Sequence, residues 1–154
     1  MFTSLGSYKE IVNPSGFLNT SGKEITIGEY VGKKIILIEF LTYTCNNCQA
    51  TFPYLVKWDA KYKNQGLITI GIQTPEFAFE KNIKNVAEGL AKYGITFPVV
   101  LDNNYSTWNA YANQFWPHRY LIDTQGNIVY EHIGEGDYDG TEKMIQTLLQ
   151  TLKK

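Results

Sequence analysis

Residues 34–53 read KIILIEFLTYTCNNCQATFP, and this stretch decides the fold. Residues 34–41 form an almost unbroken apolar run rich in Ile, which is typical of a strand buried on both faces of a sheet. Cys45 and Cys48 follow with the spacing CxxC, and apolar side chains then recur at helical spacing over residues 46–64. The stretch therefore predicts a buried strand that leads through two cysteines directly into a helix.

Strands and helices are predicted to alternate along the rest of the chain. Strand-like runs cover residues 67–73, 97–101, 119–123 and 128–133, and helical patterns cover residues 75–93, 105–113 and the stretch from about Asp139 onward. Asp139 and Glu142 have the spacing of a capping box. Residues 17–19 and 24–27 flank a polar turn with Gly22 and predict a short N-terminal β-hairpin. This order predicts an α/β fold with a mixed central sheet flanked by helices.

The length and composition favour one compact domain over residues 1–154. Of the 154 residues, 44% are hydrophobic and 19% charged, which excludes a disordered chain. The formal charge is −1, whereas binding to nucleic acid or anionic lipid needs clustered positive charge, so neither partner is expected. The strongest apolar segment, residues 35–41, is far shorter than the roughly 20 residues of a membrane span, so this chain is not expected to insert into a membrane.

The sequence leaves the cellular compartment open. Residues 1–10 lack the basic start and apolar stretch of a signal peptide. The protein is expected in the cytoplasm if the chain is complete. It is expected in an extracytoplasmic or periplasmic compartment if an export signal or membrane anchor was removed.

The CxxC pair carries the chemistry. Such a motif alone fits a redox pair, half of a zinc site or two buried thiols. A thiol in the first turn of a helix meets unpaired backbone N–H groups and the positive end of the helix dipole, which favour its thiolate. We therefore interpret Cys45 as the exposed nucleophile and Cys48 as the resolving thiol one turn further along. His118 and His132 lie far from the cysteines in the sequence, so no metal site is expected.

Residues 38–53, IEFLTYTCNNCQATFP, resemble the thioredoxin superfamily, in which an acidic residue precedes the CxxC pair and a proline follows it. Glu39 and Pro53 fill those positions, and Trp116-Pro117, directly before HRYLID, resembles the cis-proline loop. The predicted hairpin and a helical insertion over residues 75–93 are similar to the TlpA/ResA-like branch. In more detail, TYTCNNC, TPEFAFEK, LDNNYSTWNAY, WPHRYLID and GEGDYD resemble the thioredoxin-like domain of DipZ-type thiol–disulfide interchange proteins.

The resemblance implies that Glu39 takes or relays the proton of Cys48 during disulfide exchange, as a general acid/base. A lone carboxylate on a buried strand is expected to have a raised pKa, because burial disfavours its charge. The alternative is an edge residue that faces solvent. If the carboxylate is lone and buried, replacing it with an amide should leave the fold intact or make it more stable.

The resemblance also implies a surface for binding substrate. The peptide bond before Pro117 is expected to be cis and to lie beside the CxxC pair. The backbone at Trp116 is expected to pair with an extended substrate segment. Tyr43, Trp116 and Phe77 are candidates for an apolar collar around the sulfurs, the alternative being that they are ordinary core aromatics.

Together, the pattern and the resemblance predict a thiol–disulfide oxidoreductase that works without a cofactor. Its expected partners are protein dithiols and disulfides. An upstream electron donor is also expected, such as a thioredoxin system or a membrane thiol transporter. The protein itself is expected to be a monomer.

Two other functions stay open. Thr42 precedes Cys45 with the Thr-x-x-Cys spacing of peroxiredoxins, although Ile38 stands where that family has a proline. Copper chaperones of the Sco type use the same fold with two cysteines and a distal histidine. His118 lies in the matching region, although the cysteines of those proteins are separated by three residues.

Overall fold

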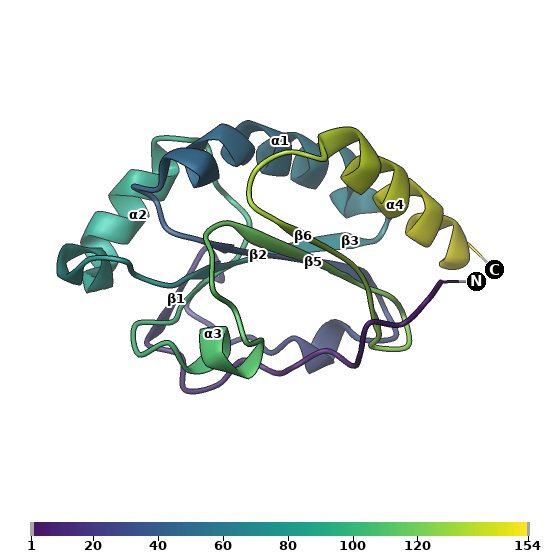
Figure 1. The fold of residues 1–154 in the computed structure, drawn as a ribbon, viewed down its shortest axis with the longest axis horizontal. Helices are drawn as coiled ribbons and strands as arrows, with labels where there is room; N and C mark the ends of the chain where they lie inside the picture. The colour runs from purple at the N-terminus through teal and green to yellow at the C-terminus, as the bar shows by residue number, and fades with distance from the viewer. Residues whose placement is uncertain (1, 154) are drawn as a thin grey trace.

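The computed structural model describes residues 2–153, which form a six-stranded sheet with helices on both faces (Figure 1). The strand order is β1-β4-β3-β2-β5-β6, with β2, β3 and β4 parallel and the remaining pairs antiparallel. The strands are β1 (Gly16–Leu18), β2 (Ile35–Leu41), β3 (Leu67–Gln73), β4 (Val99–Leu101), β5 (His118–Ile122) and β6 (Ile128–Ile133). The predicted mixed sheet is therefore confirmed, and the fold is thioredoxin-like.

Helices cover the two faces of the sheet unequally. In Figure 1, α1, α2 and α4 lie along one face, whereas α3 and the N-terminal segment lie along the other. The α-helices are α1 (Asn46–Tyr62), α2 (Ile83–Ala91), α3 (Ser106–Ala110) and α4 (Tyr138–Thr151). Short 3₁₀ helices are η1 (Gly28–Tyr30), η2 (Lys63–Gln65) and η3 (Ala78–Lys81). Among the described residues, no helix is both long and apolar enough to cross a membrane.

Strand β2 divides the hydrophobic core in two. Leu37 points toward α1 and packs in one core with Cys48. Ile38 and Phe40 belong to the other core, with Trp108 of α3. Because side chains alternate between the faces of a strand and both faces are covered, β2 is apolar along almost its whole length.

The predicted N-terminal hairpin is wrong. Strand β1 pairs antiparallel with β4, so that Phe17 lies opposite Val100. Residues 24–27 form no strand, and Ile27 is instead fully buried in the core on the α3 face. Strand β1 thereby supplies backbone hydrogen bonds along the outer edge of β4, which lies some eighty residues away in the sequence.

The N-terminal segment runs along the α3 side of the sheet before it enters β1 (Figure 1). The backbone N–H of Leu5 donates to the carbonyl of Ile128 at 2.7 Å, and that of Tyr8 donates to Gly126 at 2.9 Å. The carboxylate of Glu10 accepts hydrogen bonds from the backbone that leads into η1. These bonds attach the segment to the sheet at several points.

Two helix starts differ from the sequence prediction. The single helical stretch expected over residues 75–93 is split by Asn82, which has extended backbone angles and accepts a hydrogen bond from the N–H of Asn85 at 3.1 Å. Asn82 thus ends η3 and caps α2. In α4, Glu142 accepts hydrogen bonds from α1 side chains rather than capping the helix start, so the predicted capping box is wrong.

Candidate active site

The CxxC pair lies where β2 ends and α1 begins. Cys45 is the N-cap residue of α1, with extended backbone angles of φ −73° and ψ 124°. Its sulfur accepts a hydrogen bond from the backbone N–H of Cys48 at 3.2 Å. An N-cap side chain normally satisfies the unpaired N–H groups of the first helical turn, and here a sulfur takes that place.

The surroundings of Cys45 favour its thiolate. A hydrogen bond from the Cys48 thiol is the main cause that lowers the pKa of Cys45 to about 7, and the backbone N–H groups of Cys48 and Asn47 add to it. Partial burial and the charge of Glu76 oppose this shift. The sulfur is half-buried, so a substrate disulfide can still reach it. A large fraction of Cys45 is therefore thiolate near neutral pH.

Cys48 has the opposite character. Its side chain is completely buried on the α1 side of the sheet, and this burial strongly raises the pKa of its thiol. The hydrogen bond to Cys45 and the negative charges of Cys45 and Glu39 raise the pKa further. Cys48 therefore needs a base before it can act as a nucleophile.

Glu39 is buried, as expected, but it is not a lone carboxylate. Glu39 is 1% exposed, and its Oε1 accepts a hydrogen bond from Nε of Arg119 at 3.0 Å. Burial raises the pKa of Glu39, and the neighbouring Arg119 charge partly offsets that rise. The sequence analysis missed Arg119, because nothing in the local pattern of residues 118–123 connects it with a residue 80 positions earlier.

The Trp116–Pro117 peptide bond is cis. Pro117 is buried, and the indole Nε1 of Trp116 donates to the carbonyl oxygen of Thr74 at 2.8 Å. The Trp116 ring packs against Trp108, with 4.3 Å between the ring centroids. Trp116 also borders the core that contains Cys48, so it lies between the two cores.

The other two aromatic candidates are connected through a residue that the sequence analysis did not name. Tyr43 meets the ring of Phe79 edge-on at 6.5 Å, and Phe79 stacks on Phe77 at 5.8 Å. Phe77 and Phe79 are both about half exposed, whereas Tyr43 packs against the core. Phe77 and Phe79 stand two residues apart in TPEFAFEK, a spacing that does not bring side chains together on the helix predicted over residues 75–93, so no sequence signal indicates the pair.

Glu80 is a second buried carboxylate near the site that the sequence did not reveal. It accepts hydrogen bonds from the Thr44 hydroxyl and from the backbone N–H groups of Glu76 at 2.7 Å and Phe77 at 2.9 Å. These bonds attach the segment that carries Phe77 to the residue directly before Cys45. A glutamate in a polar, charged stretch gives no sequence signal for such a role.

His118 and Thr42, on which the copper-chaperone and peroxiredoxin hypotheses depend, contact other side chains of the protein. Nε2 of His118 lies 2.9 Å from a carboxylate oxygen of Glu131, and its ring stacks on Tyr120 at 4.4 Å. The hydroxyl of Thr42 is buried and accepts a hydrogen bond from the Gln73 amide at 2.7 Å. Within residues 2–153, no three His, Cys, Asp or Glu side chains stand close enough to hold one metal ion.

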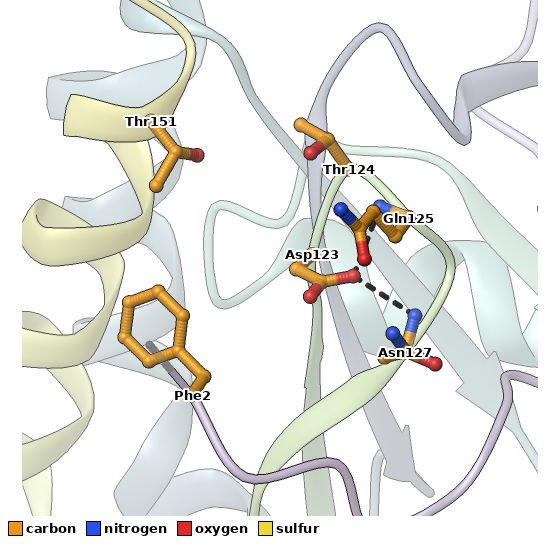
Figure 2. Close-up of a pocket in the computed structure, with 6 residues that line it drawn as sticks. All are labelled: Phe2, Asp123, Thr124, Gln125, Asn127 and Thr151. Atoms are coloured by element: carbon orange, nitrogen blue, oxygen red, sulfur yellow. Dashed lines mark hydrogen bonds between the residues drawn. The ribbon is translucent and has the colours of Figure 1, made fainter.

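A pocket of about 300 Å³ lies beside the turn between β5 and β6 (Figure 2). It is formed by the turn between β5 and β6, by Phe2 and by Thr151 of α4. Oδ1 of Asp123 accepts hydrogen bonds from the backbone N–H groups of Gln125 and Asn127, which shape the turn. Because Ile122 pairs with Ile36 at the start of β2, this turn is far from the CxxC pair.

The fold and the paired cysteines together define a class: this is a protein of thioredoxin-like fold with a CxxC pair at the start of a helix. The chain belongs to the Redoxin family, whose profile matches residues 9–149. The resemblance to the thioredoxin superfamily, and to its TlpA/ResA-like and DipZ-type members, is thereby confirmed.

Three similar proteins illustrate the relationship. Protein DipZ of Mycobacterium bovis is 44% identical over 150 residues, which are 97% of this chain but 22% of DipZ. Thiol-disulfide oxidoreductase ResA of Halalkalibacterium halodurans is 29% identical over 134 residues, 86% of this chain and 69% of ResA. The crystal structure of a thioredoxin-family thiol:disulfide interchange protein from Chlorobium tepidum TLS is 20% identical, covers 97% of both chains and superposes with a TM-score of 0.72. This chain thus spans about a fifth of the length of DipZ.

Proposed function

We propose that this protein exchanges disulfides with protein substrates through Cys45 and Cys48. The observation that carries the proposal is the asymmetry of the pair. The Cys45 sulfur is half-buried, caps a helix and has a pKa of about 7, while the Cys48 thiol is completely buried behind it. One thiol is suited to attack an incoming disulfide, and the other is suited to act only after a mixed disulfide has formed.

The reaction has two steps. The Cys45 thiolate attacks one sulfur of the substrate disulfide, a new S–S bond forms, and the second substrate sulfur leaves as a thiolate that takes a proton from solvent. Cys48 then loses its proton and attacks the Cys45 sulfur, which releases the remaining substrate sulfur. The Cys45–Cys48 pair is oxidised by two electrons and the substrate disulfide is reduced to two thiols, and the reverse direction oxidises a substrate dithiol.

In this proposal Glu39 is the base that receives the proton of Cys48. Its buried carboxylate lies close enough to contribute to the raised pKa of that thiol. Positioned groups of this kind typically accelerate proton transfer about 10²-fold to 10⁴-fold. Because burial strongly raises the pKa of the Cys48 thiol, little thiolate forms there without a base, so we expect a contribution within that range.

The substrate is proposed to bind as an extended segment beside Trp116 and Pro117. Its backbone would pair with the Trp116 backbone, and apolar side chains would contact Tyr43 and Phe77. The proposed partners are protein dithiols and disulfides, and the electron donor is a dithiol system such as a thioredoxin system or a membrane thiol transporter. We propose that the protein acts as a monomer.

The proposal is tested by trapping the mixed disulfide. Cys48→Ser removes the resolving thiol, so it should accumulate an adduct with a disulfide-containing protein through Cys45. Cys45→Ser should accumulate none, because the remaining thiol is buried and has a strongly raised pKa. Mass spectrometry of non-reduced samples detects the adduct, and an adduct formed by Cys45→Ser alone would reverse the assignment.

A further inference from the structure

Arg119 is a buried charge beside the proposed base, and the sheet brings the two together. Glu39 of β2 and Arg119 of β5 lie directly opposite each other in the antiparallel pairing. Opposite residues of such a pair project to the same face. Both side chains are almost completely buried, at 1% and 0% exposed, on the face where Arg119 contacts α1 and α4.

Several elements hold the guanidinium of Arg119 in one position. Its Nη1 donates to the Thr141 hydroxyl at 2.7 Å and to the carbonyl of Gly136 at 3.2 Å. The group also lies over the rings of Trp58 at 5.3 Å and Tyr138 at 5.7 Å. Contacts from α1, α4 and the loop before α4 therefore fix the direction in which Nε points toward Glu39.

The two carboxylate oxygens of Glu39 have different surroundings. Oε1 accepts the hydrogen bond from Arg119, but Oε2 of Glu39 is buried and, like Nη2 of Arg119, has no hydrogen-bond partner among the described residues. Leaving a buried carboxylate oxygen without a partner is unfavourable, so such atoms in folded proteins call for an explanation, and a catalytic role is one. The thiol of Cys48 lies on the same side of the sheet, in the core beneath α1.

We propose that Arg119 is a positioning residue for the resolving step: it holds Glu39 by Oε1 and leaves Oε2 free to accept the proton of Cys48. The inference rests on the proposed function and refines it, because it assigns separate tasks to the two oxygens of one carboxylate. When Oε2 takes the proton, the Cys48 thiolate attacks the Cys45 sulfur and the substrate sulfur leaves with its electron pair. The proton on Glu39 then passes to solvent or to the departing thiolate, which restores the carboxylate.

The charges around Glu39 explain why an arginine is needed. Burial alone favours the protonated carboxyl, which cannot act as a base, whereas Arg119 on β5 favours the carboxylate. His132 on β6 acts in the same direction, and Cys48 is the titratable neighbour from α1. On β3 the residue opposite Glu39 is Gly71, which has no side chain and so adds no charge. From α4, the neutral ring of Tyr138 lies against Arg119.

The test separates the two chemical steps with dithiobis-nitrobenzoate as the disulfide. Reduced protein releases one coloured thiolate when Cys45 attacks and a second when Cys48 resolves the adduct. This leaving group needs no proton, so the second phase reports on removal of the proton from Cys48. Stopped-flow measurement from about pH 5 to about pH 9 gives a rate profile for each phase.

Arg119→Met should leave the first phase unchanged and shift the pH dependence of the second phase upward, because Glu39 then stays protonated to higher pH. Near neutral pH the second phase should slow by about 10-fold, which is less than the roughly 10²-fold or more expected for loss of a general base, because Glu39 is still present. Arg119→Lys, which keeps the charge, should recover part of the rate. Lys61→Met, which removes the cation of the exposed Lys61–Glu142 ion pair, is the matched control and should change neither phase.

The outcomes distinguish a failure of the role proposed for Arg119 from a failure of the proposed function. A second phase in Arg119→Met that superimposes on wild type, with the first phase intact, overturns the role of Arg119 alone. Failure of the wild-type protein to show a Cys45-dependent first phase overturns the proposed function, and the inference falls with it. If Arg119→Met does not fold, the double variant Glu39→Gln with Arg119→Met removes both buried charges. The second phase of that double variant should be no slower than the second phase of Glu39→Gln, and additional slowing would contradict the inference.

Discussion

Three donors surround the sulfur of Cys45, and they come from one turn of α1. The Cys48 thiol makes the largest contribution, and the backbone N–H groups of Cys48 and Asn47 add to it. Asn46 and Asn47 themselves are uncharged and exposed, so the thiolate is stabilised by the helix start and by the second cysteine rather than by a nearby cation. The two cysteines are thus coupled before any disulfide forms.

This coupling predicts the pH dependence of alkylation. In the reduced protein, labelling by iodoacetamide should occur at Cys45 and rise through pH about 7, the pKa of that thiol. Labelling near pH 5 should be about 50-fold slower than near pH 7, because the reagent reacts with the thiolate. In Cys48→Ala the midpoint should move upward, toward the value of about 8.5 for a free cysteine, because the strongest donor is lost. An unmoved midpoint in that variant would show that the backbone alone sets the pKa.

Glu39→Gln should destabilise the protein, contrary to what a lone carboxylate would predict. The amide leaves Arg119 buried without a counter-charge, and breaking a buried ion pair from one side typically costs about 3 kcal/mol or more. Adding Arg119→Met should restore part of the loss, because it removes the uncompensated charge. Urea unfolding of the reduced proteins near neutral pH measures both effects, and a Glu39→Gln protein as stable as wild type would indicate that the pair contributes nothing.

Gly89 of helix α2 packs against Tyr43, in the loop before Cys45. A Cβ atom built on Gly89 would lie 2.3 Å from the ring of Tyr43, which is too close for any real contact. Glycine inside a helix costs roughly 1 kcal/mol relative to alanine. Glycine weakens the helix at this position, and its missing Cβ leaves room for the Tyr43 ring, which also contacts Phe79.

Gly89→Ala should therefore destabilise the protein by about 1–3 kcal/mol through overpacking, despite the better helix propensity of alanine. Gly140→Ala is the matched control in α4, because its Cβ would meet only the exposed carboxylate of Asp137, which can turn away once it releases its hydrogen bond from the Tyr130 hydroxyl. That variant should be neutral or more stable. Thermal unfolding compares the two, and a stabilised Gly89→Ala protein would mean that Tyr43 has room to turn away.

Across the whole chain, the features that sequence could predict are those encoded locally. The apolar run of β2, the CxxC pair at a helix start and the β-branched strand β3 all leave a signal within a few residues. The pairing of β1 with β4 and the pairing of Glu39 with Arg119 leave none, because their partners are about 80 residues apart and only the folded sheet brings them together. The lone-carboxylate expectation failed for the same reason.

The pairing of β1 with β4 bears on how this module can be cut out of a chain or joined to another. The recognisable sequence blocks begin after Leu18, but the N–H of Ser15 bonds to the carbonyl of Leu101 and β1 follows directly. A fragment trimmed to those blocks would expose the outer edge of β4, and an unpaired strand edge is a template for association with other chains. Because the N–H of Leu5 also bonds to the carbonyl of Ile128, an excision that keeps this contact has to begin before Leu5.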